Sequence, residues 1–224
     1  MRILLAERPV GETFAPDLKQ IWERDGHQVD YGADGSIHPS AGGVLCIVGN
    51  INWFPRLGRW LEKTPPVERP FIALWHYEPL PPPRAAGLPR PRLSLAEIAK
   101  IALRDPRATD VFSNFSHLRS LVRRGIPDLV MVTTEGRREY LAERGIESQW
   151  VPLGWVSRFG RPLGRQRDID VLFLGARNVP RRLQILRRLA RSGLRVVEAG
   201  DWNDPACWGE PRVELLNRAR ILLN

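Results

Sequence analysis

The chain has 224 residues and a formal net charge of +9, from 34 Lys and Arg against 25 Asp and Glu. Hydrophobic residues make up 43% and charged residues 26%, which is typical of a globular protein and argues against bulk disorder. No apolar run reaches the ~18 residues of a membrane span, and two cysteines exclude both a disulfide scaffold and a four-cysteine zinc site. The apolar run after Met1 is too short for a secretory signal, so we expect a cytoplasmic location.

The basic residues are almost all arginine and are spread through the chain, often beside an acidic residue. A nucleic-acid-binding protein usually concentrates its positive charge in a stripe. We therefore expect no specific nucleic-acid partner and interpret the charge as an ordinary solvated surface. Attraction to an anionic substrate or an anionic membrane surface is the alternative.

Short apolar runs alternate with helical segments, which is typical of a parallel α/β fold. The first expected helix shows apolar residues at helical spacing, Leu18, Ile21 and Trp22. The strands expected in the first part of the chain are 3–6, 28–31, 44–48, 71–75, 110–112, 129–132 and 149–151, and further helices are expected near 53–63, 94–104, 116–124 and 135–144.

A repeated junction supports this pattern. Gly26, Gly125, Gly145 and Gly193 each follow a helical stretch with arginine near its end and lead into an apolar run. Glycine accepts the left-handed conformation that ends a helix, and arginine in the last turn complements the helix dipole. Four helix–glycine–strand junctions favour an α/β fold over an all-α or all-β fold.

Two stretches interrupt the alternation. Residues 78–93 are rich in proline and predict a long surface loop, whereas residues 152–167 are rich in glycine and proline and predict a linker. The alternation then restarts, with strands expected at 170–174, 194–197 and 221–224 and helices between them. The domain boundaries that follow are a first domain over 1–153, a linker over 154–167 and a second domain over 168–224.

The junction after 170–174 is the strongest candidate for phosphate binding. Gly175 ends the strand, and a following helix start offers free backbone N–H groups. Arg177, Arg181 and Arg182 would add bidentate donors to a diphosphate. An ordinary βα turn with exposed arginines is the alternative, since the Walker motif and the three-glycine dinucleotide fingerprint are both absent.

Polar residues also follow the strands of the first domain, where open α/β sheets bind ligands. His76 could act as a base, and Glu78 could accept hydrogen bonds from a polyol. Asn50, Asn52 and Gly11 occupy the corresponding positions after two other strands. The alternative for His76 is that it caps the strand while Trp75 and Tyr77 pack, and the alternative for Asn50, Asn52 and Gly11 is turn formation.

Other polar residues carry weaker signals. His117 lies at the expected start of the helix 116–124, with Ser116 as its cap, and we interpret it as structural. No pair of histidines or cysteines has the spacing of metal ligands, so we expect no metal site.

The later part of the chain resembles the GT-B glycosyltransferases, and in particular the CgeB-like branch of the bacterial group 1 family. The resemblance is clearest from about 130 to 224. The residues that carry it are Thr134–Gly136, Tyr140–Leu141, Arg144–Ile146, Val151–Trp155, Asp168–Gly175, Arg181–Arg182 and Leu216–Asn224.

The resemblance implies a Rossmann-like acceptor domain followed by the first half of a second Rossmann-like domain, which holds a UDP- or GDP-sugar as substrate and no permanently bound cofactor. It also implies that the first domain handles the acceptor, with donor contacts at Gly175, Ala176, Arg177, Arg181, Arg182, Gly200 and Asp201. From this and from the strand-end positions, we expect acceptor contacts at Gly11, Asn50 and Asn52 and catalysis by His76 or Glu78.

The family's acidic donor motif, two glutamates separated by seven residues, would follow the last apolar run. We therefore expect a hexosyltransferase that is inactive as these 224 residues, with an exposed apolar patch at 221–223. The alternative is a non-catalytic relative that binds a nucleotide, an anionic polymer or a protein.

Overall fold

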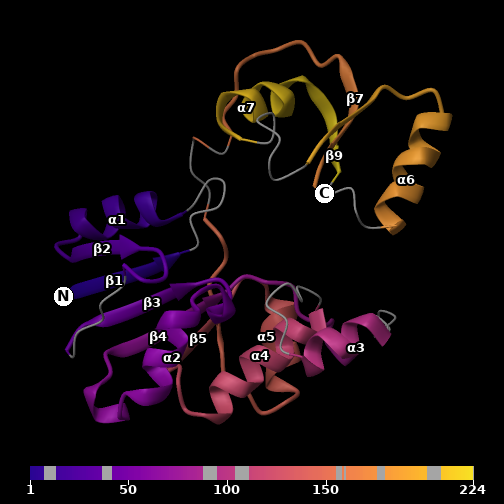
Figure 1. The fold of residues 1–224 in the computed structure, drawn as a ribbon. Coiled ribbons are helices and arrows are strands. Elements are labelled where there is room, and N and C mark those ends of the chain that lie inside the picture. The colour runs from indigo at the N-terminus through magenta and orange to yellow at the C-terminus, as the bar shows by residue number, and fades with distance from the viewer. Residues whose placement is uncertain are drawn as a thin grey trace. The chain divides into compact units, whose positions relative to one another are not determined.

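The computed structural model describes residues 1–7, 14–36, 42–87, 95–103, 111–154, 158, 160–175, 180–200 and 208–223, without the side chains of 96, 97, 100, 101, 180 and 181. The described residues form two compact units (Figure 1), one ending at Leu153 and the other beginning at Gly154.

The first unit contains a six-stranded parallel sheet in the order β2-β1-β3-β4-β5-β6. Its strands are β1 (Arg2–Glu7), β2 (Gln28–Gly32), β3 (Val44–Val48), β4 (Phe71–His76), β5 (Leu129–Val132) and β6 (Gln149–Trp150). After β1 the chain crosses to β2 on one side of β1, and after β3 it crosses to β4 on the opposite side of β3. The carboxyl ends of these two strands form the topological switch point, where open α/β sheets bind ligands.

Helices cover the two faces of this sheet unequally (Figure 1). The helices are α1 (Ala15–Arg24), α2 (Pro55–Lys63), α3 (Leu95–Ala102), α4 (Val111–Arg123) and α5 (Glu135–Ala142). Apolar residues of α1 pack with Ile3, Leu5 and Cys46, whereas those of α2, α4 and α5 pack with Leu45 and Ile47. Alternate residues of β3 thus enter two separate cores, which explains why this strand is a continuous apolar run.

The second unit has three parallel strands in the order β8-β7-β9. Its elements are β7 (Ile169–Leu174), α6 (Pro180–Arg191), β8 (Val196–Ala199), α7 (Gly209–Arg218) and β9 (Ala219–Leu223). The central strand β7 is the most buried. β9 lies at an edge, with Ile221 57% and Leu222 53% exposed, so the predicted exposed apolar patch is confirmed.

Residues 160–168 run along α7 and form ion pairs and hydrogen bonds with its successive turns. Arg161 pairs with Glu210 at 2.7 Å and Arg165 pairs with Glu214 at 3.0 Å. The backbone N–H of Leu163 donates to the side chain of Asn217 at 2.6 Å. This part of the stretch 154–167 therefore packs within the second unit.

The predicted α/β class and parallel sheets are confirmed, and they are compatible with Rossmann-like folds. The four predicted glycine stops are also confirmed, with φ between 60° and 84° at Gly26, Gly125, Gly145 and Gly193. Among the described residues, no helix combines the length and the apolar character that crossing a membrane requires.

Two local predictions are wrong. The expected strand 110–112 does not form at its described residues, because Val111 and Phe112 begin α4. His117 consequently lies inside α4, and Ser116 is not a cap. The apolar pair at 111–112 was too short to distinguish a strand from the first turn of a helix.

Candidate functional site

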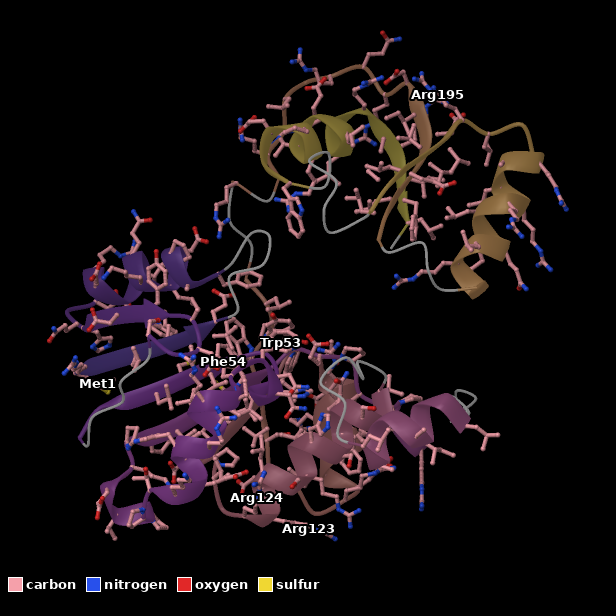
Figure 2. The ribbon with its side chains drawn as sticks, viewed as in Figure 1. Met1, Trp53, Phe54, Arg123, Arg124 and Arg195 are labelled. Carbon is pink, nitrogen blue, oxygen red and sulfur yellow. The ribbon has the colours of Figure 1, made fainter. Side chains whose placement is uncertain are left out.

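The loop after β3 forms one side of the carboxyl edge of the first sheet. Gly49 has a φ of 98°, and a Cβ at this position would overlap the ring of Trp53. Asn50 follows, and its side-chain oxygen accepts from the backbone N–H of Asn52 at 3.0 Å. Asn50 therefore forms the turn that was the alternative to an acceptor contact, and its acceptor contact stays a prediction. The turn brings Trp53 to this edge of the sheet (Figure 2).

His76 is the last residue of β4 and is only 2% exposed. Side chains alternate along a strand, so His76 shares the face of Ile72 and Leu74, on which α4 and α5 pack. Neither ring nitrogen of His76 has a hydrogen-bond partner among the described residues. Burial, the nearby charge of Arg137 and the ring of His117 lower the pKa of His76 to about 4. The ring is therefore neutral at pH 7.

The first half of α4 supplies polar side chains to the same edge. Asn114 is 1% exposed; its amide donates to the carbonyl of Pro79 at 3.0 Å, and its oxygen accepts from Asn50 at 3.5 Å. His117, one turn further, is hydrogen-bonded through Nδ1 to the side chain of Asn52. Two residues of the loop after β3 are thus held by two residues of α4.

Arg137 of α5 is hydrogen-bonded to the segment that follows β4. Its guanidinium donates to the carbonyl of Tyr77 at 2.8 Å and to the hydroxyl of Thr133. Burial lowers the pKa of Arg137, and the charge of Glu78 opposes this shift. The ring of Tyr77 lies 5.9 Å from that of Trp53, so two aromatic rings accompany the polar groups.

The structure therefore gathers four of the sequence-predicted residues, Asn50, Asn52, His76 and Glu78, at the carboxyl ends of β3 and β4. Gly11 lies outside the described residues. Sequence reasoning missed Asn114 and Arg137 and assigned His117 a purely structural role. The available signal was the position of Asn114 at helical spacing from Leu118 and Leu121, which puts a polar side chain on the apolar stripe of α4.

Glu7, the last residue of β1, is a buried polar residue at the topological switch point. Its carboxylate accepts from the backbone N–H groups of Phe14, at 2.9 Å, and of Ala15. A negative charge at a helix start satisfies free N–H groups and complements the helix dipole. Glu7 thus holds the start of α1 against β1.

In the second unit, the ends of β7 and β8 lie close together. The N–H of Gly175 donates to the carbonyl of Ala199 at 3.3 Å, and a Cβ on Gly200 would overlap the backbone of Gly175. Arg182, in the first turn of α6, lies 6.0 Å from the ring centre of Phe173. Ala176, Arg177, Asp201 and the side chain of Arg181 are outside the described residues, so the phosphate site stays a prediction.

The described residues offer neither a metal-binding cluster nor a reactive thiol. Within them, no three His, Cys, Asp or Glu side chains are grouped as metal ligands. Cys46 is buried in the sheet, and burial together with the charge of Glu7 raises the pKa of its thiol to about 12. A thiol with so high a pKa is a poor nucleophile at pH 7.

Comparison with protein-family models, curated proteins and solved structures gives no match for this chain. Function is therefore inferred from the chemistry of the residues at the strand ends.

Proposed function

We propose that the chain provides the acceptor domain and part of the donor domain of a GT-B glycosyltransferase, which transfers a hexose from a nucleotide-sugar to a hydroxyl acceptor in the cytoplasm. The observation that carries this proposal is His76. A buried polar group without a hydrogen bond costs stability, and His76 bears two such nitrogens at the ligand-binding edge of a parallel sheet. A bound hydroxyl group would satisfy one or both of these nitrogens.

In the proposed reaction, the bond between the anomeric carbon and the diphosphate oxygen breaks, and a bond to the acceptor oxygen forms. The acceptor hydroxyl loses its proton. Neutral His76 has one unprotonated nitrogen, which can accept the hydroxyl hydrogen bond. Its low pKa makes the ring a weak base in the empty site, so proton transfer to it requires that the bound substrates raise this pKa. Glu78 follows two residues later and is the alternative proton acceptor.

The surroundings of His76 suit a saccharide. Side chains of Asn52, His117 and Arg137 offer donors and acceptors, while the rings of Trp53 and Tyr77 offer apolar surface. Ligand sites commonly combine apolar and aromatic surface with a few fixed polar groups. This combination favours a polyhydroxylated acceptor over a purely apolar one.

We place the donor diphosphate on the second unit, after β7. Support comes from Gly175 at the strand end, the start of α6 and Arg182 in its first turn. A helix start attracts phosphate through its free N–H groups and its dipole.

The proposal is tested by measuring binding and turnover separately. Calorimetric titration with UDP- and GDP-hexoses should show saturable donor binding, and release of nucleoside diphosphate with a panel of saccharides should identify the acceptor. Where turnover is found, His76→Asn should lower it by about 100-fold or more, since a general base contributes at least that factor. The matched control is His27→Asn, which changes a histidine that the structure places before β2, away from this edge. Absence of binding to every nucleotide-sugar, or equal turnover by both variants, would overturn the proposal.

A further inference from the structure

The positive charge of this protein is concentrated in its second part. Residues 154–224 contain 14 arginines and seven acidic residues, a net charge of +7, whereas residues 1–153 contribute +2. Proteins with such an uneven distribution attract anionic partners to the more charged region.

Outside α6, five of the described arginines of the second unit are neutralised within it by acidic side chains. Arg161 and Arg165 pair with glutamates of α7. Arg195 and Arg218 share Asp168, at 2.8 and 2.6 Å. Arg220 pairs with Asp170 at 3.1 Å. These contacts use four of the seven acidic residues and hold the unit together.

Helix α6 is the exception. Its sequence, Pro180–Arg191, contains five arginines and no acidic residue. Arg187, Arg188 and Arg191 are exposed, and none of them forms an ion pair with any described residue. Leu186 is 3% exposed, so one side of α6 is buried within the unit, and nitrogen-tipped side chains project from the other (Figure 2).

Apolar side chains border these arginines. Ile185 is 38% exposed, and Leu194, just past the end of α6, is 39% exposed. Exposed aliphatic side chains beside unpaired cations suit the boundary between lipid headgroups and acyl chains. Single-stranded nucleic acids are bound largely by aromatic stacking, and Pro180–Arg191 contains no aromatic residue.

We propose that the exposed face of α6, formed by Ile185, Arg187, Arg188, Arg191 and Leu194, docks on a membrane surface of anionic phospholipid. The charges are complementary, and the flanking aliphatic side chains distinguish a lipid surface from a phosphate polymer. This inference concerns where the protein acts and is independent of the proposed transfer reaction.

The strength of the interaction follows from the number of cations. Each arginine near a surface rich in phosphatidylserine strengthens binding about fivefold, so three together should contribute about 100-fold. Because the attraction is electrostatic, binding should weaken strongly when the salt concentration rises from 0.1 to 0.5 M.

The test is co-sedimentation of the full chain with vesicles of phosphatidylcholine alone or with 30% phosphatidylserine. We expect binding to the anionic vesicles only. The triple variant Arg187→Gln, Arg188→Gln and Arg191→Gln should bind about 100-fold more weakly. Ile185→Ser with Leu194→Ser should weaken binding further at high salt, where the electrostatic contribution is screened.

The matched control is Arg59→Gln, Arg119→Gln and Arg123→Gln, which removes the same charge from exposed positions on α2 and α4. Circular dichroism melting should show that both triple variants remain folded. Failure of the unmodified chain to bind anionic vesicles, or equal loss in both triple variants, would overturn the proposal. Tighter, α6-dependent binding to RNA or DNA than to vesicles would identify a nucleic acid as the partner instead.

Discussion

At the scale of single residues, His76 stands out because the fold gains no hydrogen bond from it. It is 2% exposed and both ring nitrogens lack a partner in the described structure. Each buried polar group left unsatisfied costs about 1–3 kcal/mol. Residues that cost stability are typically kept for function, where binding restores the missing contacts.

Replacing His76 by leucine tests this cost. We expect His76→Leu to raise the free energy of unfolding at pH 7 by about 1–2 kcal/mol, because an apolar side chain of similar size removes the unsatisfied nitrogens. Urea denaturation followed by circular dichroism measures the change. A loss of stability in the variant would mean that His76 contributes a structural contact.

His76 also predicts how stability depends on pH. Its pKa is about 4 in the folded protein and 6.5 in the unfolded chain, so the unfolded state binds more protons between these values. The free energy of unfolding should therefore fall as the pH decreases from 6.5 to 4, by about 3 kcal/mol at most from this residue. Urea titrations across this range should show a shallower decrease for His76→Leu than for the unmodified chain. Parallel curves for the two proteins would refute this.

Adjacent arginines on α5 offer a second residue-scale comparison. Arg137 is partly buried and donates to Tyr77 and Thr133, whereas Arg138 forms an exposed pair with Glu135. Arg137→Gln should lower the free energy of unfolding by about 1 kcal/mol, because it breaks two hydrogen bonds to a charged group that is partly screened by solvent. Arg138→Gln, the control, should cause little change in the same urea titration. The reverse order of effects would contradict the assigned role of Arg137.

At the scale of elements, the edge strands of a sheet have unpaired backbone N–H and C=O groups, with which a strand of another chain can pair. β9 is an edge strand that presents Ile221 and Leu222 with more than half of their surface exposed. An exposed apolar edge strand is a template for pairing with another chain. The two halves of α4 also differ: Asn114, near its start, contacts the polar carboxyl edge of the first sheet, whereas Leu118 and Leu121, further along, pack in the core.

The β9 edge should cause self-association. We expect the chain to associate with increasing concentration in analytical ultracentrifugation, and Leu222→Lys to reduce this association by placing a charge on the edge. The matched control is Tyr31→Lys on β2, an edge strand of the other sheet with a side chain that is 54% exposed. A protein that is monomeric at all concentrations, or equal effects of both variants, would contradict the prediction.

At the scale of the whole molecule, the two units differ in the size of their cores. Among the described residues, the first unit buries two large apolar clusters on the two faces of its sheet. The described part of the second unit forms one small cluster of three buried residues, Ile169, Leu172 and Ala219, beside a few other buried apolar side chains. Local stability follows buried apolar contacts. The second unit should therefore open more easily than the first.

Hydrogen–deuterium exchange detected by mass spectrometry tests this difference. Backbone amides of β7, β8 and β9 should exchange faster than those of β1, β3 and β4 under native conditions, because less buried surface opposes their opening. Equal protection in the two sheets would show that the units open together.

The sequence by itself determined the class of fold and most of its elements. Continuous apolar runs and helical spacing predicted the strands and helices, and the glycine stops such as Gly26 and Gly145 were confirmed by their positive φ. These features depend on neighbouring residues, so local physics is sufficient to predict them. The error at 110–112 arose where a short apolar run fitted both a strand and a helix.

Only the tertiary structure decided which polar residues meet at the carboxyl edge of the first sheet. Asn50 contacts Asn114 and Asn52 contacts His117 across 64 and 65 residues of sequence, and no local pattern specifies such contacts. The unsatisfied nitrogens of His76 are likewise a consequence of what surrounds that side chain, and so is the lack of an ion pair at Arg187, Arg188 and Arg191 within the described part of the chain. A sequence shows which residues are polar, but hydrogen bonding and burial are settled by packing, because they depend on every element that folds against them.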